Sequence, residues 1–424
     1  MNSQMKIESL NNIIDFKNGK IAPKEDGNIP IYGGNGILGY TDKFNYENIV
    51  IIGRVGAYCG SVHIEKGKCW VSDNAIAGIH KHLDSNYYNY YLLKSLYLNK
   101  YQIGSSQPLL TQGILNLIEV KIHNDLNNQI EIGDFVSKID TKIELNNKGN
   151  DSLEQMAKTL YDYWFVQFDF PDANGKPYKT SGGKMVWNAE LNRYIPESWE
   201  VKTFSEWINN DKSGDWGKEQ VEGNYTEKVY CIRGADINGL NGAGELKSPE
   251  RYILEKNLHK TLDPADLIVE ISGGSPTQST GRLAFITEGT LERFDAPIIC
   301  SNFCKAVTLK NKKLLYNFVY HWKSIYDAGV LFGYEGKTSG IKNLLFDSFV
   351  SSHYTVVPEE TIAEKFYNFM EPIQTKKQKN LKENKELTSL RDWLLPMLMN
   401  GQVSVGDIEE ELRMVAEEGG RYEK

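Results

Sequence analysis

Two sets of polar, glycine-rich loops carry the side chains that are best suited to bind a ligand. In the first 126 residues the candidates are Tyr32, Asn35, Arg54, Tyr58, Ser72, Asn74, Ser105, Ser106, Gln107 and Gln112. Between residues 198 and 357 they are Ser275, Thr277, Gln278, Arg282, Asn302, Lys337, Thr338 and Ser339. Arg, Asn and Gln side chains can hydrogen-bond base edges in pairs, and Ser, Thr and backbone amides hold phosphates. For any single residue a solvated loop is the alternative interpretation, but two such sets in one chain favour nucleic-acid binding.

The sequence lacks the motifs of the common catalytic sites. Gly34-Asn-Gly-Ile-Leu-Gly39 spells a dinucleotide-binding pattern, but a loop follows it instead of a helix, which indicates a turn. Gly336-Lys-Thr338 ends like a phosphate-binding loop, yet Leu331 stands where that loop needs glycine. The sequence contains no Asp/Asn-Pro-Pro-aromatic stretch, which an amino-methyltransferase needs. Pro171-Asp172 and Glu190-Leu-Asn192 lack the lysine of a nuclease core. No His-Glu pair has the spacing of metal ligands. We therefore predict a non-catalytic chain without a metal site or cofactor of its own.

Composition indicates a cytoplasmic protein with more than one domain. A chain of 424 residues is too long for one ordinary core, and 40 % hydrophobic with 25 % charged residues is typical of globular proteins. No apolar run approaches the roughly 18 residues that cross a bilayer, and the first ten residues lack the apolar core of a signal peptide. The five cysteines form an odd set without a Cys-x-x-Cys pair, so we expect buried thiols and no disulfide scaffold or zinc site.

The net charge of −8 argues at first against a nucleic-acid partner. Residues 1–126 carry 12 Lys and Arg against 11 Asp and Glu, and residues 198–357 carry 18 against 20. Residues 127–170 carry 4 against 8, and the tail from residue 401 carries 3 against 7, a net of −4 in each. The negative charge thus lies mostly outside the two globular stretches, which leaves a basic face possible on each.

Two long helices are expected to hold these stretches apart. The first, residues 127–165, has a seam with steps of four and three residues, typical of a coiled coil: Ile132, Val136, Ile139, Ile143, Asn146, Asn150, Leu153, Ala157, Leu160 and Trp164. The second, residues 358–400, repeats it with Ile362, Phe366, Phe369, Ile373, Lys376, Asn380, Glu383, Leu387, Leu390 and Leu394. Roughly 35 helical residues make a rod of about 50 Å. The polar middle, Asn146, Asn150, Lys376 and Asn380, is predicted to fix the register of the helix pair.

The chain is predicted to contain two copies of one plan, a globular α/β (α+β) domain followed by a long helix. The expected order is domain 1–126, helix 127–165, an irregular linker 166–197, domain 198–357, helix 358–400 and an acidic tail 401–424. In the first domain, strands are expected near 29–32, 48–52 and 114–122, and a helix near 87–101. Correspondences between the copies are expected at residues 7–19 with 201–214, 49–56 with 267–274, 72–74 with 300–302, and 113–117 with 340–344.

Several motifs together resemble one known family. They are Ile51-Ile-Gly-Arg-Val-Gly-Ala-Tyr-Cys-Gly60, Trp70-Val-Ser-Asp-Asn-Ala75, Gly104-Ser-Ser-Gln-Pro108, Ile139-Asp-Thr-Lys-Ile-Glu-Leu-Asn146, Phe168-Asp-Phe-Pro171, Ser181-Gly-Gly-Lys-Met-Val186, Ile195-Pro-Glu-Ser-Trp-Glu-Val201 and the run from Leu390 to Gly401. In this order they resemble the specificity subunit of Type I restriction-modification systems over nearly the whole chain. The second domain departs from the pattern, because Ser272-Gly-Gly-Ser-Pro-Thr-Gln278 replaces the glycine-arginine-x-glycine run of the first. Arg54 therefore has no direct counterpart in the sequence of the second domain.

The resemblance implies two target recognition domains, each binding one half of a bipartite double-stranded DNA site. It also implies that the two helices form an antiparallel coiled coil on which two modification subunits dock, with restriction subunits joining in the full complex. Methyl transfer with S-adenosylmethionine, and translocation and cleavage with ATP and magnesium, would belong to those partners. The geometry agrees, because about 50 Å corresponds to roughly 15 base pairs, and two different domains imply an asymmetric target.

Two hypotheses of other classes remain open. One is a DNA methyltransferase or nuclease that carries its own recognition domains, and the other is an interaction protein whose domains bind protein. Methylation by the isolated chain would favour the first, and an absence of specific duplex binding would favour the second.

Overall fold

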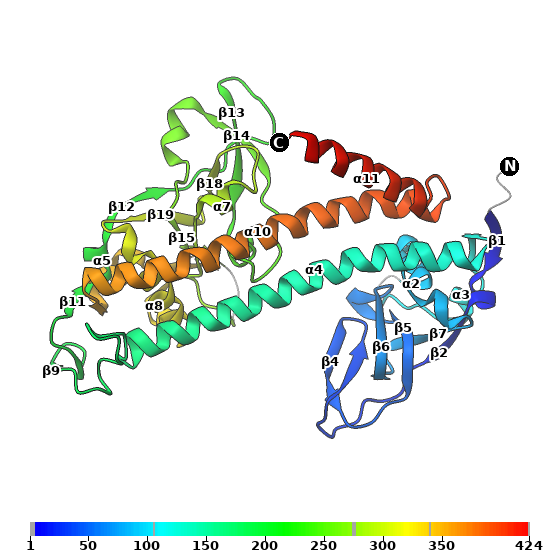
Figure 1. Ribbon diagram of the computed structural model, residues 1–424, viewed down its shortest axis with the longest axis horizontal. Helices are drawn as coiled ribbons and strands as arrows, with labels where there is room; N and C mark the ends of the chain where they lie inside the picture. Colours follow the sequence, from blue (N-terminus) through cyan, green and yellow to red (C-terminus); the bar gives the residue numbers. More distant parts are fainter. Residues whose placement is uncertain (1–4, 105–106, 274–276, 339–340, 423–424) are drawn as a thin grey trace. The chain divides into compact units, whose positions relative to one another are not determined.

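The computed structural model describes residues 5–104, 107–273, 277–338 and 341–422 (Figure 1). The chain forms two compact units. Unit 1 comprises Met1–Glu144 and Lys385–Lys424, and unit 2 comprises Leu145–Asn384. Each unit therefore contains one globular domain and a segment of each long helix. Among the residues described, every helix is too short or too polar to cross a lipid bilayer.

The domain of unit 1 is built on a six-stranded sheet in the order β2-β7-β5-β6-β3-β4. Its strands are β2 (Ile14–Asn18), β3 (Ile29–Gly33), β4 (Gly36–Thr41), β5 (Tyr46–Gly53), β6 (Val62–Val71) and β7 (Ala75–His80). Neighbours are antiparallel except β3 and β6, which are parallel. A separate antiparallel pair joins β1 (Met5–Ser9) to β8 (Glu119–His123). The helices are α1 (Leu10–Ile13), α2 (Asn86–Ser95) and α3 (Gln112–Asn116), with 3-10 turns η1 (Gly56–Tyr58), η2 (Leu83–Ser85) and η3 (Leu98–Tyr101).

The domain of unit 2 repeats this plan. The order β12-β19-β15-β17 matches β2-β7-β5-β6, and β14-β13-β18 with its parallel β13–β18 pair matches β4-β3-β6. The strands are β12 (Ile208–Ser213), β13 (Tyr225–Ile232), β14 (Glu250–Leu254), β15 (Leu267–Glu270), β17 (Leu283–Phe285), β18 (Ile298–Cys300) and β19 (Cys304–Leu309). The pair β11 (Glu200–Thr203) and β22 (Tyr354–Val357) matches β1 and β8. The predicted internal duplication is thus confirmed.

Smaller elements complete unit 2. A three-stranded sheet joins β16 (Ser272–Gly273), β21 (Ile341–Leu344) and β20 (Glu335–Thr338). The helices are α5 (Phe204–Trp207), α6 (Ile237–Leu240), α7 (Glu288–Leu291), α8 (Leu315–Asp327) and α9 (Phe346–Ser352), with 3-10 turns η5 (Gly234–Asp236), η6 (Glu255–Lys260), η7 (Lys312–Leu314) and η8 (Val330–Tyr334). The predicted irregular linker contains a hairpin of β9 (Met185–Asn188) and β10 (Arg193–Pro196). It is ordered because Phe168, Phe170 and Ile195 are buried in the core of unit 2.

The two long helices are α4 (Leu126–Tyr161), which continues as the π-helical turn η4 (Asp162–Val166), and α10 (Glu360–Met399). The Asn127 amide near the start of α4 donates to Asp125. In unit 1, Ile132 and Val136 of α4 share a core with Leu394 and Leu398 of α10. In unit 2 the opposite ends meet, as Ala157 shares a core with Phe366. The pair is therefore antiparallel, and its apolar ends belong to the cores of the two domains.

The polar middle of the helix pair is buried in part. Asn380 donates to Asn150 over 2.8 Å, and both side chains are 4 % exposed. Asn146 donates to Glu383 over 2.8 Å and to Asn384 over 2.9 Å. These are contacts between helices that a shift in register would break.

The predicted seam of the second helix needs correction. Lys376 is exposed, and the neighbouring Lys377 is the buried lysine. Phe369 and Leu390 are also exposed, whereas Met370 and Gln374 are buried. The reason is that α10 packs on the second domain as well as on α4: Tyr316 of α8 donates to Glu371 over 2.6 Å. A helix with two packing partners needs a wider buried face than a coiled-coil seam.

The remaining differences concern short elements. The predicted strand near 114–122 is the helix α3 followed by β8, and the predicted helix near 87–101 is α2 with η3. Residues 405–422 of the acidic tail form α11 (Val405–Tyr422). All five cysteines are buried and free, as predicted.

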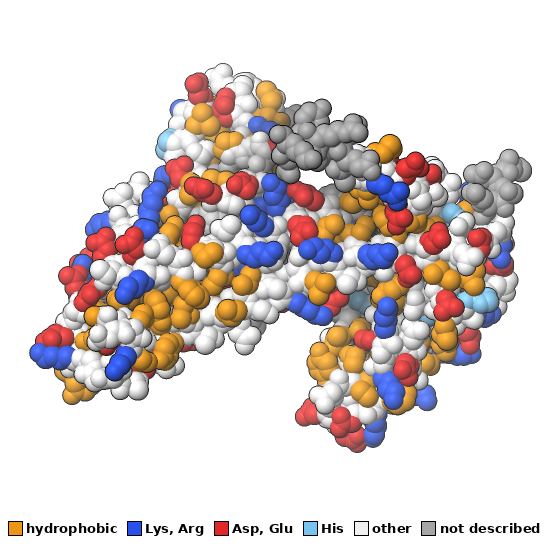
Figure 2. All heavy atoms as spheres, viewed as in Figure 1, with side chains coloured by type: hydrophobic (Ala, Val, Ile, Leu, Met, Phe, Trp, Pro, Cys, Tyr) orange, Lys and Arg blue, Asp and Glu red, His pale blue; other side chains and the backbone are white. Residues whose placement is uncertain are grey.

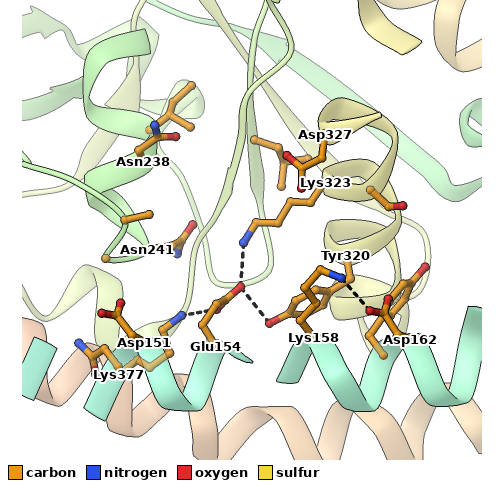
Figure 3. A pocket seen from close by; sticks show the side chains of 17 residues that line it. Asp151, Glu154, Lys158, Asp162, Asn238, Asn241, Tyr320, Lys323, Asp327 and Lys377 are labelled. Carbon is orange, nitrogen blue, oxygen red and sulfur yellow. Dashed lines mark hydrogen bonds and ion pairs between the residues drawn. The ribbon is translucent and has the colours of Figure 1, made fainter. Parts of the chain in front are cut away.

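A partly buried carboxylate joins the domain of unit 2 to both helices. The Glu154 carboxylate of α4 accepts hydrogen bonds from Lys323 over 3.1 Å and from Tyr320 over 3.3 Å, both in α8. It also forms an ion pair with Lys377 of α10 (Figure 3). These groups line a cavity of about 440 Å³ between α4, α6 and α8. Burial raises the pKa of the Glu154 carboxyl, but the ammonium groups of Lys323 and Lys377 outweigh burial and lower it to about 2.

Unit 1 has a similar junction on the same helix. The Asp140 carboxylate of α4 accepts hydrogen bonds from Tyr91 of α2 over 2.7 Å and from Arg391 of α10 over 2.6 Å. In both units a carboxylate of α4 thus accepts a tyrosine from the domain and a cation from α10. These junctions hold each domain on its segment of the helix pair.

Replacing Glu154 by alanine is expected to destabilise unit 2 by about 2 kcal/mol, because it leaves the buried Lys377 unpaired; the partial exposure of Glu154 keeps the loss below that of a fully buried pair. Since the folded-state pKa of Glu154 is depressed, its contribution is present at neutral pH and is lost as the pH falls from about 4.3 toward 2. Urea unfolding at pH 7 and pH 3 measures both effects. Asp162→Asn, which removes an exposed pair with Lys158, is the control and should change stability by at most about 0.5 kcal/mol.

Candidate nucleic-acid interface

The predicted loops of unit 1 come together at one place. The Ser72 amide donates to the Tyr32 carbonyl over 2.8 Å, and the Arg54 amide donates to the Asn74 carbonyl over 3.0 Å. The Gly56 amide donates to the Pro108 carbonyl over 3.1 Å, which adds the loop before α3. Four loops that are far apart in the sequence therefore share one hydrogen-bonded framework.

The candidate side chains on this framework differ in accessibility. Asn35, Tyr58, Asn74 and Gln107 are exposed, Arg54 and Gln112 are half-buried, and Tyr32 and Ser72 are buried. Tyr32 donates to Glu65 over 3.0 Å, and burial is the main reason that its pKa is raised. Ser105 and Ser106 lie outside the described residues.

Arg54 is the candidate cation of this surface. Its Nη1 approaches the Asp73 carbonyl at 3.5 Å, and its buried Nε has no hydrogen-bond partner. Among the described residues, no carboxylate lies within 4.0 Å of its guanidinium. The outer nitrogens of the Arg54 guanidinium, which make only this one long contact within the described residues, thus remain available to an external acceptor.

The predicted loops of unit 2 also meet. The carbonyl of Phe303 accepts the amides of Ile271 over 2.9 Å and Ser272 over 3.1 Å, and the Ser272 hydroxyl donates to Asn343 of β21 over 2.5 Å. Thr277, Gln278 and Asn302 are exposed on this side. Lys337 and Thr338 end β20, and Ser275 and Ser339 lie outside the described residues.

Arg282 is engaged inside its domain. Its Nε and Nη2 donate to the two carboxylate oxygens of Glu270 over 2.8 and 2.6 Å. The Glu270 side chain is buried, and the hydrogen bonds to it raise the pKa of Arg282. The sequence shows an arginine in a polar loop but gives no sign of this internal partner.

Backbone hydrogen bonds establish which positions of the two domains correspond. Arg54 donates its amide to Asn74 and accepts the amide of Leu110 at its carbonyl. Ile271 makes the same two bonds, with Phe303 and Leu344. The structural counterpart of Arg54 is therefore Ile271.

The same bonds change three expected correspondences. Gly53 exchanges backbone bonds with residues 60 and 61 as Glu270 does with residues 281 and 282. Gly53 therefore matches Glu270, which shifts the expected match of residues 49–56 with 267–274 by one residue, and Arg282 occupies the place of Ser61. Phe303, and not Asn302, occupies the place of Asn74. Residues 113–116 lie in α3, whose counterpart is α9, whereas residues 341–344 match the strand-like segment before α3. Loops of different length on the two sides hide these matches in the sequence.

One glycine in each domain fixes the loop that carries the Asn74 or Phe303 position. A Cβ at Gly19 would lie 1.9 Å from the Ser72 carbonyl oxygen, and a Cβ at Gly214 would lie 2.0 Å from the Ser301 oxygen. This match confirms the predicted correspondence of residues 7–19 with 201–214. It also shows that both loops are held by the same close backbone contact.

Comparison with known proteins shows what the chain is similar to. A family model described as the Type I restriction modification DNA specificity domain matches residues 2–155. The Type I restriction enzyme MjaIX specificity subunit of Methanocaldococcus jannaschii is 24 % identical over 336 residues, which cover 76 % of this chain and 70 % of that protein. A further relative, the EcoprrI specificity subunit of Escherichia coli, is 33 % identical over 128 residues, 28 % of this chain and 30 % of that protein. The first part of the chain thus matches the DNA specificity domain, and the chain is similar to Type I specificity subunits.

The chain also has the fold of a solved protein. The S subunit of a Type I restriction-modification system from M. genitalium superposes with a TM-score of 0.61 at 16 % identity, covering 94 % of this chain and 97 % of that chain. Among the described residues of this chain, no three His, Cys, Asp or Glu side chains are grouped as metal ligands.

Gly19→Ala is expected to lower the stability of unit 1 by about 1 to 3 kcal/mol, because the added methyl group must displace the Ser72 backbone. Thermal unfolding measures the loss. Gly39→Ala is the matched control, since no atom lies within 4 Å of a Cβ there. Equal effects of the two substitutions would contradict the close contact at Gly19.

Proposed function

We propose that this chain is the DNA-reading subunit of a Type I restriction-modification complex, and that each domain reads one half of a bipartite, asymmetric target. The observation that carries this proposal is the shared backbone framework with different side chains on it. Arg54 and Asn74 in unit 1 stand where Ile271 and Phe303 stand in unit 2. A common framework explains how both domains can approach DNA alike, and the exchanged side chains explain how they can read different bases.

The side chains of unit 1 suit base pairs that present hydrogen-bonding groups in the major groove. An arginine can bind guanine O6 and N7 together, and an asparagine can bind adenine N6 and N7. Arg54 is half-buried with free donors, and Asn74 is exposed beside it. The exposed Asn35 and Gln107 provide further amides on the same framework.

The helix pair is proposed to set the spacer between the half-sites. A helix of 36 residues, the length of α4, is about 54 Å long, which corresponds to roughly 16 base pairs. The contacts of Asn146, Asn150 and Asn380 between the helices support a fixed register. In that case the spacer length is a property of the helices, and the half-sites are properties of the domains.

Both units display apolar side chains on the helix pair that support docking of two modification subunits. In unit 2, Met156 and Phe369 are 56 % and 45 % exposed and line a groove with Tyr163. In unit 1, Leu390 and Trp393 are 36 % and 64 % exposed. Figure 2 shows hydrophobic side chains gathered over the carboxyl-terminal part of α4. Exposed apolar patches of this kind mark protein interfaces.

The repeat relates the two patches. The backbone contacts match Leu110 with Leu344, and the same offset along the chain matches Leu153 with Leu387 and Met156 with Leu390. Each unit thus offers an equivalent patch, which supports one modification subunit for each. Those partners would bring S-adenosylmethionine, and the restriction subunits would bring ATP and magnesium.

Exchange of residues 198–357 for the corresponding domain of a relative with another target is expected to change one half of the methylated sequence only. Sequencing of methylated sites in cells that carry the exchanged complex measures this. A change in both halves would contradict separate reading. Methylation of DNA by the chain alone, without modification subunits, would contradict a non-catalytic role.

Met156→Asp together with Leu390→Asp is expected to weaken binding of modification subunits by about tenfold or more, because each charge would be buried in an apolar contact. Isothermal titration with the purified modification subunit gives affinity and stoichiometry. Thr375→Asp, which adds the same charge at an exposed polar position of α10, is the control. Unchanged affinity in the double variant would place the docking surface elsewhere.

A further inference from the structure

We propose that Phe303 reads a thymine in the second half-site by contact with the 5-methyl group of that base. The inference rests on the proposed function, namely that the domain of unit 2 binds DNA. It adds the residue that determines specificity and the chemical group that it recognises.

The backbone around Phe303 is fixed on both sides. The Ser301 amide donates to the Ile232 carbonyl over 2.9 Å, and the Cys304 amide donates to the Ser301 carbonyl over 2.9 Å. The Phe303 carbonyl accepts two amides, from Ile271 and Ser272. Gly214 packs directly against the Ser301 carbonyl. These backbone contacts therefore hold the side chain at position 303 in a fixed place on the loop.

The Phe303 side chain is exposed on this loop. Phe303 is 54 % exposed, although β18 and β19 on either side of it are largely buried. Within the described residues its ring makes no contact with another aromatic ring. Its exposed neighbours in the loop set, Asn302 and Gln278, are polar. A large apolar side chain that is more than half exposed beside amides suits a ligand that offers an apolar group among polar ones.

A base pair in the major groove is such a ligand. Thymine alone among the four bases carries a methyl group there, and a phenylalanine can contact it. In unit 1 the same position holds Asn74, whose amide suits adenine. The neighbouring position changes in the same sense, from Arg54 to Ile271, so that hydrogen-bond donors are replaced by apolar side chains. Insertion of the ring between base steps is the alternative use of an exposed phenylalanine, and it does not depend on the methyl group.

The experiment uses the full chain in complex with modification subunits, together with a DNA duplex that contains the sequence that this complex methylates. Each thymine of the second half-site, on either strand, is replaced in turn by deoxyuridine, which keeps the base pair and removes only the methyl group. We expect one position at which affinity falls by about fourfold, the effect of one lost methyl contact. Phe303→Ala should weaken binding to the thymine duplex similarly and should no longer distinguish uracil at that position.

Three controls separate the possible outcomes. The Asn302→Ala variant should retain the response to deoxyuridine. Deoxyuridine in the first half-site should give no effect that depends on Phe303. The thermal unfolding midpoint of Phe303→Ala should stay near that of the parent, because the Phe303 side chain is exposed. If the complex binds no specific duplex, the proposed function itself fails. Three results would overturn the inference about Phe303 alone while leaving the proposed function intact. The complex binds its duplex but deoxyuridine at no position lowers the affinity; Phe303→Ala still distinguishes uracil from thymine fully; or the second half-site contains only G·C pairs.

Discussion

The packing of α4 against α10 is the interaction on which both units depend. Neither domain has a complete core of its own: Ile132 and Leu394 belong to the core of unit 1, and Ala157 and Phe366 to that of unit 2. The two carboxylates on α4, Asp140 and Glu154, add a tyrosine of the domain and a cation of α10 to each core. A helix that is shared in this way must keep its register with its partner, since a slip would disturb both cores. The buried pair of Asn150 and Asn380 lies where such a slip would break hydrogen bonds.

The duplication preserves the framework and changes what it displays. Backbone bonds at Arg54 are repeated at Ile271, and the close glycine contact at Gly19 is repeated at Gly214. Backbone hydrogen bonds carry no side-chain identity, so the surface residues can be exchanged at little cost to the fold. Under the proposed function, this division would let the chain acquire a new half-site while it retains its partner surfaces and its helix pair.

The elements with strong local patterns could be predicted from the sequence. The seam of α4 follows from apolar spacing, and the duplication follows from repeated turns and strands. Placements that depend on tertiary contacts could not be predicted. Lys377 is buried in place of Lys376 because α10 packs on α8 as well as α4, and Arg282 turns inward because Glu270 lies buried beside it. The match of Asn74 with Phe303 depends on backbone hydrogen bonds between segments far apart in the chain, which no local pattern contains.

Two domains on one helix pair are proposed to read two separate and different half-sites. Single-molecule sequencing of methylated bases, in a genome whose methylation depends on this chain and its modification partners, tests that claim most directly. We expect one asymmetric motif made of two specified half-sites with an unspecified spacer of constant length between them. A continuous motif, a palindromic motif or a spacer of variable length would contradict it.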